Sequence, residues 1–350
     1  MFGIPIDILL SFVTAFVITF LAIPKIIFFA QKFHLYDSAG VRSSHIGKVP
    51  IFGGIAIFAG IIFSLLFWAE IEQIQFIIVS MFVVFFVGVI DDLLSLSPLR
   101  KVIGQIIAIL IIIYFPSENG LQINNMYGVL GIYELPDIVA TLFTVFVVIV
   151  ITNGFNLIDG VDGLACSLGI VASFSFGLLS VISGQINMSL IAFTLMGSLI
   201  GFLIYNKHPA KIFMGDTGSL VVGLVLSILA INAINSGIIN DSMHLPNKGP
   251  LVAIAILAVL LFDSLRVFIV RVIKGKNPLF PDMNHIHHAL LNLGYGHKKT
   301  TLIICIINIL LIVVAYFLLD MNINFAIAIF AAINFTLLYI PFLMKKKNDD

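Results

Sequence analysis

Residues 74–92 read IQFIIVSMFVVFFVGVIDD, a mostly apolar run that ends in two aspartates. An α-helix rises about 1.5 Å per residue, and the hydrocarbon core of a bilayer is about 30 Å thick. This run therefore predicts a helix that crosses most of a membrane and carries Asp91 and Asp92 at one of its ends.

Runs of the same kind recur along the whole chain. They predict spans near residues 4–24, 49–69, 74–90, 102–115, 138–152, 165–183, 188–204, 220–234, 250–271, 301–319 and 324–343. The 350 residues are 60% hydrophobic and 10% charged, whereas soluble domains are about one-quarter charged. We expect an all-α integral membrane protein that forms one domain over residues 1–350, with about eleven transmembrane helices, ten being the alternative. The net charge is zero, and we expect no nucleic-acid partner.

The basic residues predict how the chain lies in the bilayer. With the N-terminus outside, 17 of the 18 Lys and Arg residues fall on the inner side and only Lys248 falls outside. Positive residues concentrate on the cytoplasmic side of membrane proteins, so we expect the C-terminus to be cytoplasmic. The outer segment 116–137 contains Gly and Asn among alternating apolar residues, which predicts a short hairpin.

Five segments on the inner side are rich in acidic residues, His, Asn and Gly: residues 35–54, 88–101, 153–165, 206–219 and 274–299. Ionisable groups at membrane depth are costly and mark functional sites by default. The alternative for Asp91 and Asp92 is that they mark the end of a span.

The third segment, NGFNLIDGVDGLA, places polar residues at every third position. We expect these residues to form a stripe that winds slowly around one side of a helix, with glycines that let a ligand approach. Carboxylates beside amides suit a hydrated Mg²⁺ and a hydroxylated substrate; a solvated loop is the alternative. The stripe consists of Asn153, Asn156, Asp159 and Asp162.

The fourth segment ends in Gly-Asp-Thr-Gly-Ser, directly before a predicted span. Backbone N–H groups at a helix start favour an anion, and Asp216 could hold a metal ion that bridges to it. Simple capping of the helix is the other interpretation. Lys211, just upstream, is a candidate for binding a diphosphate.

The fifth segment contains His285, His287 and His288. Zinc is the competing interpretation, but no Cys and no HExxH motif accompany these residues. We expect them to donate to phosphates and the following stretch to lie on the membrane surface. The first segment adds His45 and Lys48, which either bind a ligand or anchor the topology.

The motifs P-x-x-GG (50–54), DD (91–92), NxxNxxDGxDGLA (153–165), FMGDTGS (213–219) and HIHH (285–288) together resemble the polyprenyl-phosphate N-acetylhexosamine-1-phosphate transferases. They occur in the order of that family, and the resemblance covers essentially the whole chain. HIHH resembles the branch that starts O-antigen, teichoic acid or capsule synthesis. The sister branch, the phospho-N-acetylmuramoyl-pentapeptide transferases, typically carries three consecutive His, and Ile286 breaks that run here.

The resemblance implies a reaction between a UDP-N-acetylhexosamine and undecaprenyl phosphate at a bacterial cytoplasmic membrane. N-acetylglucosamine is the default sugar, UMP is released, and Mg²⁺, or Mn²⁺ in its place, is the cofactor. The resemblance leaves the oligomeric state open between monomer and homodimer. A secondary transporter is the remote alternative; its site would lie near the bilayer midplane.

The resemblance also implies residue roles. Asp216 would bind the metal, and Asp91 would be a base or a contact to the acceptor phosphate and a second metal ligand. Asp92, Asp159 and Asp162 would be catalytic. The substrate-binding residues would be Lys48, His45, Asn153, Asn156, Lys211, Phe213 (stacked on uracil), His285, His287 and His288. A lipid phosphate is largely dianionic at neutral pH, with a second pKa of about 6, so we expect a single displacement in which Asp91 orients the acceptor. A covalent aspartyl intermediate is the rival mechanism.

Overall fold

The computed structural model describes residues 5–33, 49–115, 121–236, 248–275 and 285–344. Thirteen helices and one two-stranded hairpin make up these residues. The long helices are α1 Ile6–Lys32, α2 Gly53–Trp68, α3 Ile71–Leu94, α4 Pro98–Tyr114, α5 Asp137–Ile158, α6 Leu164–Ile182, α7 Ile186–Asn206, α8 Gly215–Asn235, α10 Ala258–Ile273, α12 His297–Phe317 and α13 Ile323–Leu343. The short elements are α9 Gly249–Ile256, α11 Ile286–Asn292, β1 Asn125–Val129 and β2 Ile132–Glu134.

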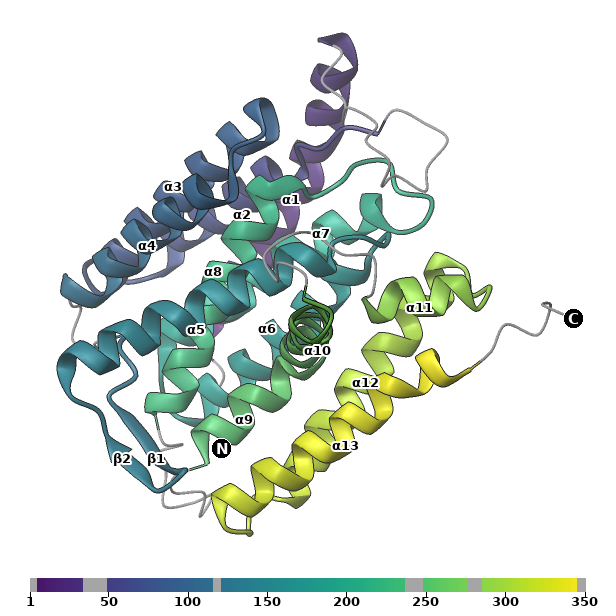
Figure 1. Ribbon diagram of the computed structural model, residues 1–350. Coiled ribbons are helices and arrows are strands. Elements are labelled where there is room, and N and C mark those ends of the chain that lie inside the picture. The colour runs from purple at the N-terminus through teal and green to yellow at the C-terminus, as the bar shows by residue number, and fades with distance from the viewer. Residues whose placement is uncertain (1–4, 34–48, 116–120, 237–247, 276–284, 345–350) are drawn as a thin grey trace, which may run out of the picture.

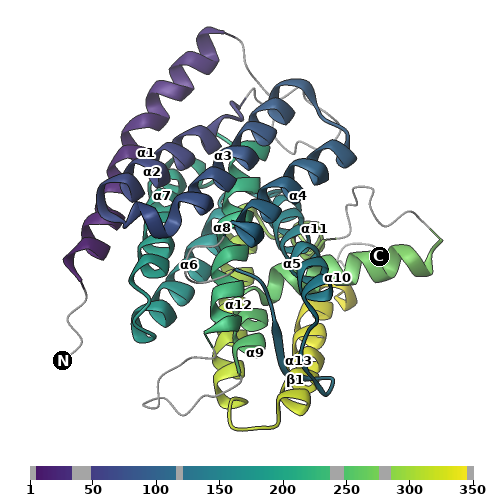
Figure 2. The ribbon, with the colours of Figure 1, turned by 90° about the vertical axis from the view of Figure 1, so that its left-hand side faces the viewer.

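Helix α8 forms the centre of the bundle (Figure 2). In its most apolar 18-residue stretch 94% of the residues are buried, against 28% in α1, α12 and α13. A helix that is apolar all around is expected to be surrounded by other helices, and α3 and α5 pack directly on α8. The first turn of α8, which carries Asp216, is therefore held from several sides.

Small residues bring helices close to the start of α8. A Cβ atom on Gly88 of α3 would collide with the Thr217 backbone, and one on Gly54 of α2 would collide with Gly218. Helices in membranes associate through such small residues, because lipid offers no hydrophobic drive between them. The end of α3 and the beginning of α2 are thereby fixed against the beginning of α8.

In each of the eleven predicted spans, one helix or a pair of helices covers most of the residues that the structure describes. Within the described ranges, eight helices are long and apolar enough to cross a membrane, and a bent pair would make a ninth. Helices α2 and α4 contain 16 and 17 residues, shorter than the roughly 20 residues of a typical span. The multi-helix membrane fold is confirmed, while the count of eleven and the orientation stay predictions.

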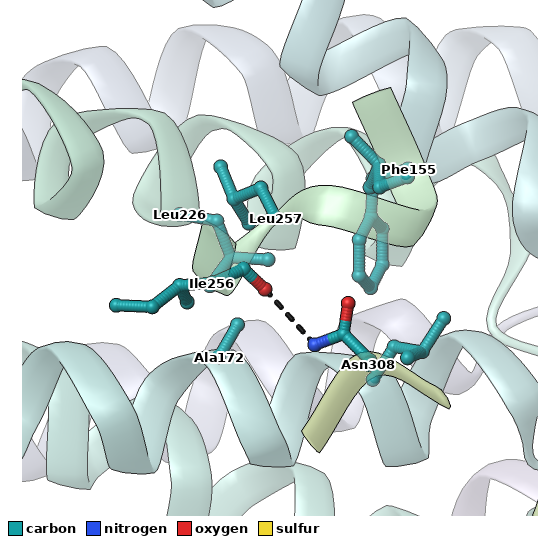
Figure 3. Close-up of a pocket in the computed structure, with 8 residues that line it drawn as sticks. Phe155, Ala172, Leu226, Ile256, Leu257 and Asn308 are labelled. Carbon is teal, nitrogen blue, oxygen red and sulfur yellow. Dashed lines mark hydrogen bonds between the residues drawn. The ribbon is translucent and has the colours of Figure 1, made fainter. Parts of the chain in front are cut away.

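The ninth predicted span, 250–271, is formed by two helices and not by one, so the prediction of one continuous helix was wrong. The structure breaks it at Leu257 into α9 and α10, which are bent by 80°. Asn308 of α12 replaces the lost helical bonds. Its Nδ2 donates to Ile256 O at 3.1 Å (Figure 3), and its Oδ1 accepts from Val259 N at 3.2 Å. Broken helices are tolerated in membranes where neighbouring side chains satisfy the backbone. The small cavity beside Asn308 has otherwise apolar walls (Figure 3), so it offers little to a nucleotide.

The hairpin predicted within 116–137 is confirmed as β1 and β2, which pair antiparallel. It lies at the lower end of the molecule in Figure 1, close to the beginnings of α9 and α13. Tyr127 Oη donates to Asn235 O at the far end of α8, 2.9 Å away. Since the described acid-rich segments gather around the beginning of α8, they lie at the opposite end of the bundle from the hairpin.

Candidate active site

The two consecutive aspartates lie in the last turn of α3, which ends at a left-handed Ser95 with φ 50°. Asp91 is 4% exposed, and its Oδ1 accepts from Leu96 N at 2.6 Å. Successive helical residues point about 100° apart, so Asp92 faces a different neighbour.

Asp92 caps the beginning of α8 from another helix. Its carboxylate accepts from Asp216 N at 2.7 Å, from Thr217 N at 3.0 Å and from Thr217 Oγ1 at 2.5 Å. The first N–H groups of a helix have no partner within the helix, and a carboxylate there is stabilised by hydrogen bonds and by the helix dipole. Gly215 makes this approach feasible, because it has φ +71° and a Cβ there would lie 2.7 Å from Asp92. The hydrogen bonds give Asp92 a structural role as a helix cap, and the catalytic role predicted from the sequence stays a prediction.

Lys101, at the start of α4, joins the two predicted metal ligands. Its Nζ lies 2.5 Å from Asp91 Oδ2 and 2.9 Å from Asp216 Oδ2. The side chains of Lys101 and Asp216 are 23% and 25% exposed, so water or a ligand can reach this point. Sequence reasoning missed Lys101, because a basic residue at the inner end of a span also reads as a topology anchor.

The amides of the polar stripe divide between two partners. Asn156 hydrogen-bonds through Nδ2 to Asp216 Oδ1 and to Ser219 Oγ, the latter at 2.8 Å. Asn153 instead pairs with Gln105 of α4, at 3.2–3.3 Å. The structure therefore brings Asn156 to Asp216 and leaves Asn153 as a link between α4 and α5.

The stripe is only partly helical, which corrects the sequence prediction. Helix α5 ends at Ile158, and Asp159 and Asp162 lie in the turn that follows. A Cβ at Gly154 would lie 3.0 Å from Leu260, so this glycine serves helix packing and not ligand approach.

Asp159 lies near enough to Asp216 and Asp92 to feel their charges. Burial, followed by the negative charges of Asp216, Asp92 and Asp162, raises its pKa to about 8. A carboxyl with such a pKa is mostly protonated at neutral pH, and it would ionise readily if positive charge were brought to the cluster. We refer to Asp91, Asp92, Asp159 and Asp216 as the acid cluster.

Asp162 has separate partners in this structure. Its Oδ2 lies 2.7 Å from His208 Nδ1 and accepts from Ala210 N at 3.2 Å. Asp162 N also donates to His297 Nδ1 of α12 at 3.3 Å. These contacts join Asp162 to the segment that follows α7 and to the start of α12, and the catalytic role predicted from the sequence stays a prediction. His208 was not among the predicted site residues.

The histidine segment is anchored by a buried carboxylate of α10. Asp263 Oδ2 lies 2.7 Å from His285 Nδ1, and Asp263 Oδ1 accepts from Ile286 N at 3.0 Å. Arg266 Nη2 lies 3.3 Å from the same oxygen, so a basic residue of the same helix also pairs with this carboxylate. His285 is 3% exposed, so it holds the start of α11 in place.

His287 extends from α11 toward the polar stripe. A Cβ at Gly160 would lie 2.9 Å from His287 Nε2, so the imidazole lies directly over this glycine, one residue after Asp159. Burial and then the neighbouring His288 and His285 lower the pKa of His287 to about 3. The ring is therefore neutral at physiological pH and offers a hydrogen bond to a ligand, not a positive charge. Among the described residues, its buried Nδ1 has no hydrogen-bond partner.

The segment before α8 pairs with the segment before α2. Phe213 N donates to Pro50 O at 2.8 Å, and Gly53 N donates to Phe213 O at 3.0 Å. Phe213 is partly exposed and Lys211 is exposed, so both can meet a ligand as predicted. His45 and Lys48 lie outside the described residues.

Comparison with known proteins identifies relatives of this chain. The model of glycosyl transferase family 4 matches residues 74–234. A probable undecaprenyl-phosphate N-acetylglucosaminyl 1-phosphate transferase of Bacillus subtilis is 32% identical, over 86% of this chain and 82% of its own length. A decaprenyl-phosphate N-acetylglucosaminephosphotransferase of Mycolicibacterium smegmatis is 30% identical over 86% and 80%, and an undecaprenyl-phosphate alpha-N-acetylglucosaminyl 1-phosphate transferase of Yersinia pestis is 29% identical over 79% and 74%.

The chain belongs to this family of polyprenyl-phosphate N-acetylhexosamine-1-phosphate transferases. The resemblance drawn from five short motifs is therefore confirmed, and this transferase is a polytopic membrane enzyme. Its relatives are named for transfer to undecaprenyl or decaprenyl phosphate, so the pentapeptide branch of the family is not favoured.

The donor set of this transferase fits a magnesium ion. Asp91 and Asp216 offer carboxylate oxygens, the hard ligands that Mg²⁺ prefers. Both lie within 3 Å of one ammonium group, so the geometry already places positive charge between them. The metal-ligand prediction for these two residues is compatible with the structure and remains a prediction.

Proposed function

We propose that this transferase moves N-acetylglucosamine-1-phosphate from UDP-N-acetylglucosamine to undecaprenyl phosphate, releases UMP and thereby starts a lipid-linked cell-envelope polysaccharide. The observation that carries the proposal is the acid cluster with Lys101 between Asp91 and Asp216, at 2.5 and 2.9 Å. Joining two anionic phosphates requires opposite charge held in advance at the place where they meet. The names of the relatives support the sugar and the polyprenyl acceptor.

In the proposed reaction, an oxygen of the lipid phosphate forms a bond to the phosphorus that carries the sugar. The bond from that phosphorus to the bridging oxygen breaks, and UMP leaves with that oxygen and its electron pair. One diphosphate linkage replaces another, so the reaction is close to reversible. The lipid phosphate is already largely dianionic at neutral pH, because its second pKa is about 6, and it needs little help from a base.

The residues divide the remaining work. Lys101 donates to phosphate oxygens, Asp91 and Asp216 would hold Mg²⁺, and neutral His287 donates a hydrogen bond to the donor. Mg²⁺, when bound, neutralises negative charge that develops on the diphosphate. Phe213 and Lys211 are proposed contacts to uracil and diphosphate.

The hydrogen bonds of the two aspartates favour a single displacement over a covalent intermediate. Asp92 accepts three hydrogen bonds from the first turn of α8, and Asp91 is held by Leu96 N and Lys101. A nucleophile must approach phosphorus with a lone pair that is available. Enzyme given donor alone should therefore release no stoichiometric UMP; release of one UMP per enzyme, with the labelled sugar retained on the protein, would contradict this mechanism.

The proposed location is the bacterial cytoplasmic membrane, with the acid cluster facing the cytoplasm. The support is the charge asymmetry, since 17 of 18 Lys and Arg residues lie on the predicted inner side. UDP-sugars are water-soluble, and an active site at that face would meet the nucleotide from the cytoplasm and the acceptor from the inner leaflet.

The experiment is UMP release from purified protein with undecaprenyl phosphate, Mg²⁺ and a panel of UDP-sugars. We expect UDP-N-acetylglucosamine to be used best, and UDP-glucose not at all. The matched variants are Asp216→Asn, which should lose activity, and Asp320→Asn, which changes an exposed aspartate between α12 and α13 and should keep it. No release with any N-acetylhexosamine donor would contradict the proposal, and an active Asp216→Asn would contradict the metal assignment.

A further inference from the structure

Three side chains of metal-binding type lie close to the acid cluster. They contact one another and form a separate group. Asp162 lies in the turn between α5 and α6, His208 follows α7, and His297 begins α12. One ligand atom from each lies within 4.8 Å of the other two. The chain separations are 46 residues from Asp162 to His208 and 135 to His297, so nothing in the local sequence indicates this arrangement.

The separations suit a single ion. His208 Nδ1 lies 2.7 Å and His297 Nδ1 lies 3.7 Å from the same Asp162 oxygen, Oδ2. A tetrahedral zinc ion with bonds of about 2.0–2.2 Å holds its ligand atoms about 3.4 Å apart. The two observed distances lie on either side of this expected separation. The two imidazole rings are stacked, with their centres 4.7 Å apart and their planes at 25°. His297 Nδ1 also accepts from Asp162 N at 3.3 Å, and a bound ion would take the place of that hydrogen bond.

We propose that Asp162, His208 and His297 form a binding site for a divalent transition-metal ion of the zinc class, separate from the magnesium ligands. Two imidazoles and a carboxylate are a common zinc ligand set with a fourth position open to water. Imidazole nitrogen favours Zn²⁺ and its neighbours in the transition series, whereas Mg²⁺ prefers oxygen ligands and keeps its water. The two sites therefore select different ions by ligand chemistry.

Hydrogen bonds around the three residues hold the ligands in place, as outer-shell contacts do in metal sites. Asp162 Oδ2 accepts from Ala210 N at 3.2 Å, and Thr301 Oγ1 donates to Asp162 O at 3.2 Å. Asn206 ties the same segments together, since its Oδ1 accepts from Gly163 N at 3.0 Å and its Nδ2 donates to Ile212 O at 2.9 Å.

Exposure indicates how an ion would enter. The Asp162 side chain is 1% exposed and His297 is 12% exposed, while His208 is 38% exposed. The site is closed on the protein side and open at His208. A bound ion would join the turn that carries Asp159, the segment before α8 and the beginning of α12. The site is thus a structural clamp beside the active site, and its existence does not depend on the proposed reaction.

The first test measures metal content without substrates. Full-length protein in detergent is stripped with a chelator, incubated with Zn²⁺ in excess Mg²⁺, passed through a desalting column and analysed by mass spectrometry for metals. We expect one Zn²⁺ per chain in the wild type and an affinity at least about tenfold lower in His208→Ala and His297→Ala. Asp216→Asn should retain the zinc, which separates this site from the magnesium ligands.

A matched control removes a histidine from elsewhere. His244→Ala changes a residue that the sequence places in an outer loop. This variant should bind zinc as the wild type does. Equal zinc binding by the wild type, His208→Ala and His297→Ala would overturn the proposal, as would absence of zinc from all of them. The three residues would then be a hydrogen-bonded cluster only.

A second measurement needs no variant and so avoids any loss of folding. Co²⁺ added to the stripped wild-type protein should give the strong visible absorption of a four-coordinate ion, and Zn²⁺ should displace it. Thermal melting should shift upward with Zn²⁺, because a ligand that binds only the folded state stabilises it. A weak octahedral Co²⁺ spectrum with no change in melting would contradict the proposed site.

Discussion

The ammonium group of Lys101, at the start of α4, lies 2.9 Å from a carboxylate oxygen of Asp216, at the start of α8. The residues are 115 positions apart, and the same ammonium lies 2.5 Å from Asp91. The ammonium group of Lys101 is therefore the point at which positive charge meets the acid cluster.

Lys101→Met should lower kcat by about 100-fold or more, the usual cost of removing one electrostatic contact to a transition state. The methionine keeps the length of the side chain but leaves Asp91 and Asp216 without their shared cation. Arg100→Met is the matched control, because Arg100 is the exposed neighbour on the same helix. Steady-state UMP release measures both, and equal activity of the two variants would remove Lys101 from the mechanism.

Asp92→Ala should lower the stability of the protein as well as its activity. Loss of a helix cap costs about 0.5–2 kcal/mol, and here the uncapped helix begins with Asp216. Asp92→Asn keeps an amide oxygen that can accept from Thr217, so this variant should lose less stability than Asp92→Ala. Thermal melting in detergent measures the effect. A wild-type melting temperature together with lost activity in Asp92→Ala would contradict a purely capping role and support the catalytic role predicted from the sequence.

His285→Ala should raise KM for the UDP-sugar, with kcat/KM reduced by up to about 100-fold, because a small displacement of α11 misplaces His287. His285→Asn should recover part of the loss, since its amide can still donate to Asp263. Rescue by asparagine is the result that separates positioning from direct contact with the donor. Equal defects in the two variants would favour direct contact.

Asp159→Asn should alter the dependence of stability on pH. The pKa of Asp159 is about 8 in the folded protein against 3.8 in a model peptide. Between these two values the folded state holds a proton that the unfolded state has lost, so this residue makes the protein less stable as pH rises from about 4 to about 8. Melting temperatures measured in EDTA should rise for the variant relative to the wild type over that range. Above that range the difference between the two should stay constant. Parallel curves would show that Asp159 is ionised in the fold.

Much of the fold and part of the site could be predicted from the sequence, because apolar runs and short motifs are local. Asp91, Asp216 and Asn156 meet as the motif order implied. The cap that Asp92 provides joins residues 124 and 125 positions apart, and no pattern in one sequence reveals such a contact. His285 and His287 look equivalent in HIHH, yet only the fold shows that one binds Asp263 and the other lies over Gly160.

The break at Leu257 escaped prediction for a related reason. Sharp kinks usually occur at Pro or Gly, and the sequence around Leu257 contains neither. The break is instead stabilised by Asn308, a residue of another helix, which supplies the missing donor and acceptor. Polar residues inside apolar runs are thus the local sign of such a partner, although they do not say where the partner lies.

The most direct test of the account follows the phosphorus atom. Wild-type protein is given undecaprenyl phosphate, Mg²⁺ and UDP-N-acetylglucosamine whose sugar-linked phosphate carries ³²P. We expect the label to move into the lipid phase with the sugar and the released UMP to be unlabelled, with Asp216→Asn inactive and Asp320→Asn unaffected. Sugar transferred to lipid while the label stays on a released UDP would contradict the central claim, because the enzyme would then transfer sugar and not sugar phosphate.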